Sequence, residues 1–181
     1  MLNILLLSAT DYEHNCKEIN GVPIHLTGIG KINAGVQTTR LIEKYDPDVV
    51  INFGSCGNLR DFELGEVLRV TSVVNDIDTK GFYNPPELFL PGKFKGVKCL
   101  TTDHMYDPSD KHLDSYSDKI NECDIVEMEL YSIVQSCILA EKIVYSYKWV
   151  SDDGSQDQWL KYAKLGFESF KEQIIKEFKI G

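Results

Sequence analysis

Arginine is the scarcest charged residue in this sequence. Only three of the 181 residues are arginine (Arg40, Arg60 and Arg69), and the formal net charge is −9. An acidic surface is repelled by the phosphate backbone, so we expect no nucleic-acid partner. The charge does not exclude a small ligand whose polar groups become buried.

Long apolar runs are also missing. No stretch approaches the roughly 20 apolar residues of a membrane-spanning helix, so we expect no membrane partner. The first residues, MLNILLLSATDYEHN, lack the basic region of a signal peptide, and acidic residues follow their apolar run at once. We therefore expect a buried strand there, and a cytoplasmic protein.

The sequence has no C-x-x-C pair and no histidine-rich cluster. Its five cysteines are scattered, at positions 16, 56, 99, 123 and 137, and its four histidines lack the spacing of metal ligands. An odd number of cysteines also disfavours a closed disulfide framework. We expect a reduced protein that binds no metal and needs no cofactor.

Apolar segments alternate with amphipathic ones along the chain. We expect strands over the apolar, β-branched segments 3–9, 22–28, 48–54, 66–75, 97–103, 124–128 and 143–153. We expect helices over the periodic or polar segments 31–45, 109–121, 130–142 and 157–178, and a long loop over the proline-rich segment 76–96. The pattern predicts an α/β fold, a single domain over 1–181 with a mixed central sheet flanked by helices.

Polar or glycine-rich motifs follow several of the expected strands. In α/β sheets, ligands bind beyond the carboxyl ends of the strands, so these motifs could surround one pocket. GIGK (28–31) could leave backbone N–H groups free for a ligand, and GSCG (54–57) could bind an anion or a sugar hydroxyl, but a plain tight turn explains each about as well. GIGK fits neither a dinucleotide-binding fingerprint nor a Walker A loop.

Acidic residues also stand at these strand ends. Asp152 and Asp153 lie in a turn-like SDDGS segment, and such pairs are commonly just solvated. Glu13 could be an ordinary acid at a helix N-terminus. In DIVEMELYSIVQS (124–136), Glu127 and Glu129 could favour the dipole of the following helix or form the floor of a site, and the residues alone leave both possibilities open.

These motifs, in their order, resemble the purine nucleoside phosphorylase and nucleosidase superfamily. The resemblance rests on GIGKINA, PDVVINFGSCGNL, VEME opening a helix, VSDD after the last strand, and ILLLSATDYE at the start. The branch they resemble most is that of the 5'-methylthioadenosine/S-adenosylhomocysteine nucleosidases and futalosine hydrolases. The resemblance covers most of the chain. It implies a three-layer fold, a purine nucleoside as the small-molecule ligand, methionine salvage as the setting, and a homodimer.

The resemblance also implies roles for three carboxylates. Asp152 would be the general acid beside the purine, Glu13 would orient and deprotonate the attacking water, and Glu129 would hold the ribose hydroxyls. Glu127 would support the turn within DIVEMELYSIVQS. Further substrate-binding positions implied by the same motifs are Ile29, Ser55, Gly57, Met105, Tyr106, Met128, Lys148 and Ser151.

These residue types suit cleavage of an N-glycosidic bond. The purine leaves more readily when an acid protonates it, and an Asp acts as an acid near neutral pH when burial or a neighbouring negative charge raises its pKa. A carboxylate near the ribose favours the positive charge that develops on the sugar.

Water is the expected nucleophile. Phosphorylase relatives hold phosphate with an arginine near the GSCG-type motif, whereas this sequence has Asn52 two residues before Gly54. We therefore expect hydrolysis of a 5'-modified purine nucleoside. The alternatives are a phosphate-dependent phosphorylase and a non-catalytic nucleoside-binding protein; a dinucleotide-binding domain is disfavoured because the first strand is followed by SATDYE.

Overall fold

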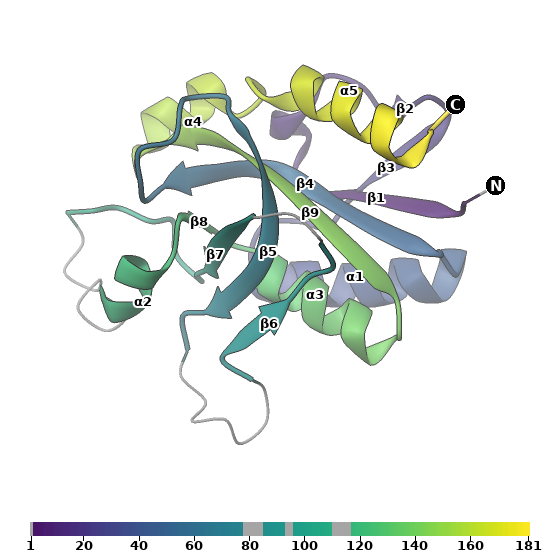
Figure 1. The fold of residues 1–181 in the computed structure, drawn as a ribbon, viewed down its shortest axis with the longest axis horizontal. Coiled ribbons are helices and arrows are strands. Elements are labelled where there is room, and N and C mark those ends of the chain that lie inside the picture. Colours follow the sequence, from purple (N-terminus) through teal and green to yellow (C-terminus); the bar gives the residue numbers. More distant parts are fainter. Residues whose placement is uncertain (1, 78–84, 93–95, 110–116) are drawn as a thin grey trace.

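The computed structural model describes residues 2–77, 85–92, 96–109 and 117–181. They form one mixed β-sheet with helices on both sides (Figure 1). The strands are β1 (Ile4–Ser8), β2 (Glu18–Ile19), β3 (Val22–Leu26), β4 (Val49–Asn58), β5 (Val67–Asn75), β6 (Glu87–Phe89), β7 (Val97–Thr101), β8 (Ile125–Glu127) and β9 (Ile143–Asp152). The helices are a 3₁₀ turn η1 (Asp11–Glu13), α1 (Lys31–Tyr45), α2 (Ser117–Glu122), α3 (Leu130–Leu139), α4 (Gln156–Tyr162) and α5 (Phe167–Phe178).

Five strands of the sheet close into a ring. β4 pairs with β9, β9 with β5, β5 with β7, β7 with β8, and β8 pairs back onto the end of β4. β1, β3 and β2 continue the sheet outward from β4, and β6 pairs with β5. The ring brings the carboxyl ends of β4, β8 and β9 together at one end of the sheet.

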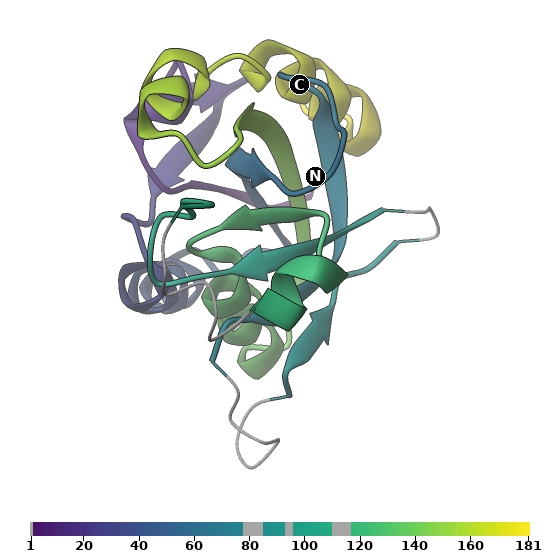
Figure 2. The same cartoon turned by 90° about the vertical axis from the view of Figure 1, so that its left-hand side faces the viewer.

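Alternation along the central strands divides the core into two layers, because successive side chains of a strand point to opposite faces. Leu6, Phe53 and Trp149 pack against α5, whereas Leu5 and Val50 belong to the cluster that includes α1 and α3. Both views show α1 and α3 on one side of the sheet and α4 and α5 on the other (Figures 1 and 2). The expected α/β architecture is confirmed.

The expected single helix over 157–178 is wrong. Two helices, α4 and α5, occupy this segment, and the chain breaks between them. Trp149 lies at the break: its indole N–H donates to the carbonyl of Ala163 at 2.7 Å, and a Cβ added to Gly166 would lie 2.3 Å from Trp149 Cβ. The buried tryptophan therefore separates the two helices, which an amphipathic pattern alone does not reveal.

Other boundaries also differ from expectation. GSCG lies within β4 and not in a turn, because β4 continues to Asn58 and pairs with both β9 and β8. The expected loop over 76–96 contains strand β6, while its residues 78–84 and 93–95 lie outside the described residues. Of the helix expected over 109–121, residues 110–116 lie outside the described part and α2 begins at Ser117.

None of the helices in the described segments is both long and apolar enough to cross a membrane.

Candidate active site

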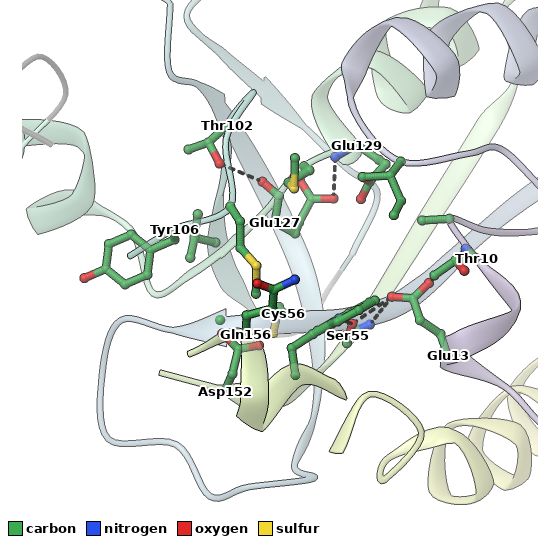
Figure 3. A pocket seen from close by; sticks show the side chains of 17 residues that line it. Thr10, Glu13, Ser55, Cys56, Thr102, Tyr106, Glu127, Glu129, Asp152 and Gln156 are labelled. Carbon is green, nitrogen blue, oxygen red and sulfur yellow. Dashed lines mark hydrogen bonds between the residues drawn. The ribbon is translucent and has the colours of Figure 1, made fainter. Parts of the chain in front are cut away.

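A cavity of about 310 Å³ opens where β4, β8 and β9 end, and its walls come from segments far apart in the sequence (Figure 3). Its lining residues are Ala9, Thr10, Glu13, Ile29, Ser55, Cys56, Gly57, Thr102, Met105, Tyr106, Val126, Glu127, Met128, Glu129, Asp152, Gln156 and Trp159. Figure 3 shows Glu13, Glu129 and Asp152 approaching it from three different sides. The cavity therefore combines apolar walls with several carboxylates.

Both carboxylate oxygens of Glu13 accept hydrogen bonds. The 3₁₀ turn η1 carries it, and Thr10 caps this turn through a reciprocal capping box. Its Oε1 accepts hydrogen bonds from the backbone N–H and the hydroxyl of Ser55, both at 2.8 Å, and its Oε2 accepts one from the Ser8 hydroxyl at 2.9 Å. Gly54 makes room for it, because a Cβ added there would lie 2.6 Å from Glu13 Oε1.

Glu129 connects the start of α3 to the start of α1. It occupies the N-cap position of α3, and its Oε1 accepts the backbone N–H of Gly30 at 2.8 Å. The GIGK motif had suggested backbone N–H groups that are free for a ligand. The N–H of Gly30 is not free, because it donates to Glu129. Burial and the neighbouring carboxylate of Glu127 raise the pKa of Glu129 to about 8.

Glu127 supports the start of α3. Its carboxylate accepts the backbone N–H groups of Glu129 and Leu130 and the hydroxyl of Thr101. It also forms a buried ion pair with Lys148, whose Nζ lies 3.1 Å from Glu127 Oε2. Glu127 thus acts as a helix cap and as a wall of the cavity at once, so the two interpretations of DIVEMELYSIVQS are compatible.

Asp152 ends β9 and lies beside Gly57. Its Oδ2 accepts the Ser151 hydroxyl at 2.7 Å, and its Oδ1 accepts the backbone N–H of Gly154 at 2.9 Å. Burial raises the pKa of Asp152, the two hydrogen bonds oppose this, and the charge of Asp153 adds to it. The pairing of β9 with β4 shifts by one residue here, so that Cys56 pairs with Val150 but Gly57 with Asp152.

The structure gathers ten of the twelve expected site residues around the cavity, from Glu13 to Asp152. The other two, Ser151 and Lys148, were expected to bind substrate but are not among its lining residues. Both side chains are buried behind the wall, where Ser151 contacts Asp152 and Lys148 contacts Glu127.

Several lining residues were not expected from the sequence. They are Ala9, Thr10, Cys56, Thr102, Val126, Gln156 and Trp159. Trp159 is the largest of them: it lies on α4, and its indole N–H donates to the Ser55 hydroxyl at 2.9 Å. It was not expected, because its contact with Ser55 joins residues 104 positions apart in the sequence. Gln156 is adjacent to the expected motif at 151–155 and could have been found by extending it.

Residues 16–115 match the family model described as "Phosphorylase superfamily". A curated 5'-methylthioadenosine/S-adenosylhomocysteine nucleosidase from Bacillus cereus (strain G9842) is 30% identical over 187 aligned residues, covering 84% of this chain and 80% of the relative.

Solved structures share the fold. A 5'-methylthioadenosine/S-adenosylhomocysteine nucleosidase from Neisseria meningitidis, in complex with methylthio-immucillin-A, superposes with a TM-score of 0.79 at 21% identity, covering 96% of this chain and 97% of that one. A futalosine hydrolase mutant from Helicobacter pylori strain 26695 gives a TM-score of 0.78 at 16% identity, with coverages of 97% and 100%.

Proposed function

Because this chain belongs to the phosphorylase superfamily, we propose that it is an N-ribosyl hydrolase that cleaves the N-glycosidic bond of a 5'-modified purine nucleoside. The observation that carries the proposal is the convergence of Glu13, Glu129 and Asp152 on one cavity. Each carboxylate is held differently and so suits a different task. A cavity of about 310 Å³ lies within the range of small-molecule sites.

Asp152 is the general acid. Burial raises its pKa, which keeps a proton available closer to neutral pH than for an exposed Asp. As the bond between the anomeric carbon and the purine nitrogen breaks, its electron pair moves onto the purine. Transfer of the proton from Asp152 to the purine neutralises that charge and makes the base a better leaving group.

Glu129 binds the ribose hydroxyls. One of its oxygens is occupied by the N–H of Gly30, and its side chain borders the cavity, where hydroxyl donors of a sugar could reach it. Such donors lower the pKa of Glu129, so sugar binding favours the ionised carboxylate. That charge then stabilises the oxocarbenium-like sugar of the transition state. Met128, which also lines the cavity, packs against the sugar.

Glu13 holds the water. Its carboxylate is fixed by Ser55 and Ser8, and it accepts a proton as the water oxygen bonds to the anomeric carbon. The products are the free purine and the free sugar, so the step needs no co-reactant besides the water. Ile29, Met105 and Tyr106, lining the cavity, are placed for the apolar parts of the nucleoside.

Water is favoured over phosphate by the charge of the cavity. Of the lining residues in the described part of the chain, none is arginine or lysine, and the carboxylates would repel a phosphate ion. Arg60 and Arg69 are engaged elsewhere, with the carbonyl of Asn121 and with Glu177.

The proposal is tested by incubating the purified protein with 5'-methylthioadenosine, S-adenosylhomocysteine and futalosine in phosphate-free buffer. Chromatography should show the free base and the free sugar. Turnover that requires phosphate and yields a sugar 1-phosphate would instead identify a phosphorylase. Binding of nucleoside by calorimetry without turnover would identify a non-catalytic homologue. Activity on methylthioadenosine or adenosylhomocysteine would place the protein in methionine salvage.

We also propose that the protein is a homodimer and that it is located in the cytoplasm. The apolar residues Ile29, Ile32 and Val36 are exposed near the start of α1, and Ile32 and Val36 line a groove between α1 and α3. A second copy could cover this face, and Ile29, which also lines the cavity, would then lie at the interface. Light scattering should give twice the chain mass, and I32D should reduce it. Cell fractionation tests the location.

A further inference from the structure

Trp159 is linked to Glu13 through one hydroxyl group. The indole Nε1 of Trp159 lies 2.9 Å from Ser55 Oγ, and Ser55 Oγ lies 2.8 Å from Glu13 Oε1. An indole N–H can only donate, so Ser55 Oγ must accept from it. The single hydroxyl proton of Ser55 is then free to be donated to Glu13. The donor sequence therefore has one direction, from Trp159 through Ser55 to Glu13.

A second contact joins the same two segments. The rings of Trp159 and Tyr12 lie with their centroids 6.0 Å apart, and Tyr12 precedes Glu13 in η1. Trp159 thus touches the turn that carries Glu13 by packing and reaches its carboxylate by hydrogen bonding. Glu13 Oε1 accepts hydrogen bonds from both the hydroxyl and the backbone N–H of Ser55, so two donors of one residue fix this oxygen.

The helix that carries Trp159 is bonded at its end by the Trp149 indole, which donates to the carbonyl of Ala163. None of the residues of α4 is fully buried, and Ser155 caps its start. The hydrogen bond of the Trp159 indole is a prominent polar link between this helix and the floor of the cavity. A shift of α4 would therefore move the Ser55 hydroxyl and, through it, the carboxylate of Glu13.

From this arrangement we infer that Trp159 is a positioning residue for the proposed hydrolysis: its indole N–H fixes the Ser55 hydroxyl so that Glu13 is aligned to hold the attacking water. The inference rests on the proposed function for its kinetic consequence, while the hydrogen-bond chain exists independently of turnover. A phenylalanine at this position would keep the ring and lose the donor. The W159F variant therefore separates the contribution of the hydrogen bond from that of the aromatic ring in the cavity wall.

The kinetic test is a double-mutant cycle of W159F and S55A, read as kcat/KM on the nucleoside that the protein turns over best. W159F should lower kcat/KM about fivefold in the wild-type background, the effect of one lost neutral hydrogen bond. In the S55A background it should have no further effect, because the link is already broken. L160A, a change at the neighbouring exposed position of α4, is the matched control and should leave activity unchanged.

Equal losses from W159F in both backgrounds would overturn the inference, since Trp159 would then act only by packing against the substrate. Thermal unfolding of each variant verifies that it folds.

The second test needs no turnover. The chain has two tryptophans, and the indole N–H of Trp149 donates to Ala163 and not to Ser55. In a proton–nitrogen correlation spectrum of labelled protein, loss of one indole signal in W159F assigns Trp159. S55A should shift that signal and speed its exchange with solvent, and should leave Trp149 unchanged. An unmoved Trp159 signal in S55A would refute the chain. If no nucleoside is hydrolysed, the proposed function fails, and this spectrum still decides the inference.

Discussion

Lys148 and Glu127 form an ion pair inside the protein, with Nζ 3.1 Å from Oε2 and each side chain 3% exposed. Burial opposes the charge of Lys148, but Glu127, Glu129 and Glu13 outweigh burial and raise its pKa above the ordinary value. Glu127 lines the cavity and Lys148 lies behind it, and Glu127 in turn caps α3 next to Glu129. One buried ammonium group thus balances the carboxylates on that side of the site.

Removing this ammonium group should destabilise the fold. K148M leaves Glu127 buried without a cation, which costs about 3 kcal/mol or more in the free energy of unfolding. K148R keeps the charge and should lose much less. Urea unfolding followed by tryptophan fluorescence measures the difference. K142M, which breaks the exposed pair of Lys142 with Asp46, is the matched control and should change little. A K148M protein as stable as wild type would contradict the assignment.

Asp152 should control the alkaline limb of the pH–rate profile. D152N should lower kcat by about 100-fold or more, because the amide cannot supply the proton. The neighbouring charge of Asp153 raises the pKa of Asp152, so D153N should lower that pKa. The rate would then begin to fall at a lower pH than in the wild type. A profile of kcat/KM against pH for both proteins measures the shift, and an unchanged alkaline limb in D153N would argue against it.

The stability of the folded protein should fall as the pH rises from about 4.5 to about 8, because Glu129 stays protonated in the folded state over this range. Its pKa is raised from 4.5 to about 8, so between these values the folded protein holds a proton that the unfolded chain has lost. Stability therefore decreases with rising pH in this window, by up to about 1.4 kcal/mol per pH unit. E129Q removes the titration. Urea unfolding should show that E129Q gains stability relative to wild type as the pH rises from 5 to 8. If the free energy of unfolding changed equally with pH in both proteins, Glu129 would not carry this titration.

Gly54 should tolerate no side chain. The Cβ of G54A would meet Glu13 Oε1 at 2.6 Å, so Glu13 must move away from Ser55. We expect a loss of kcat/KM of at least 100-fold, because the water-holding carboxylate is displaced. G35A is the matched control, since its Cβ would make only an ordinary contact with Ser132 at 3.5 Å. Steady-state kinetics on both variants, with circular dichroism to verify folding, decides the matter.

The sequence predicted the architecture well because apolar strands and amphipathic helices have distinct periods. Leu5, Leu6 and Leu7, for example, are all buried, as expected for a strand covered on both faces. Local pattern could not show that β4 continues through GSCG, because only pairing with β8 and β9 keeps those residues extended. It also could not show the break before α5, which depends on Trp149 packing from another strand.

The same distinction holds for the site. Glu13, Glu129 and Asp152 were expected because recognisable motifs carry them, and their individual roles stay predictions. Trp159 was not expected, since a local pattern does not show that this helix turn lies against Ser55. Lys148 was expected to contact substrate, whereas its neighbour in space is Glu127. Sequence motifs indicate which residues gather at this end of the sheet, but not which of them line the cavity and which are buried behind its lining.

The register shift between β4 and β9 has a consequence for engineering this protein. Over the paired stretch β9 carries one residue more than β4 at Ser151, and Asp152 lies beside Gly57 only because of this extra residue. Inserting or deleting one residue elsewhere in β9 would shift this register by one and turn a different side chain toward the cavity. Libraries aimed at new activity should therefore vary the identity of residues near the end of β9 and keep its length constant.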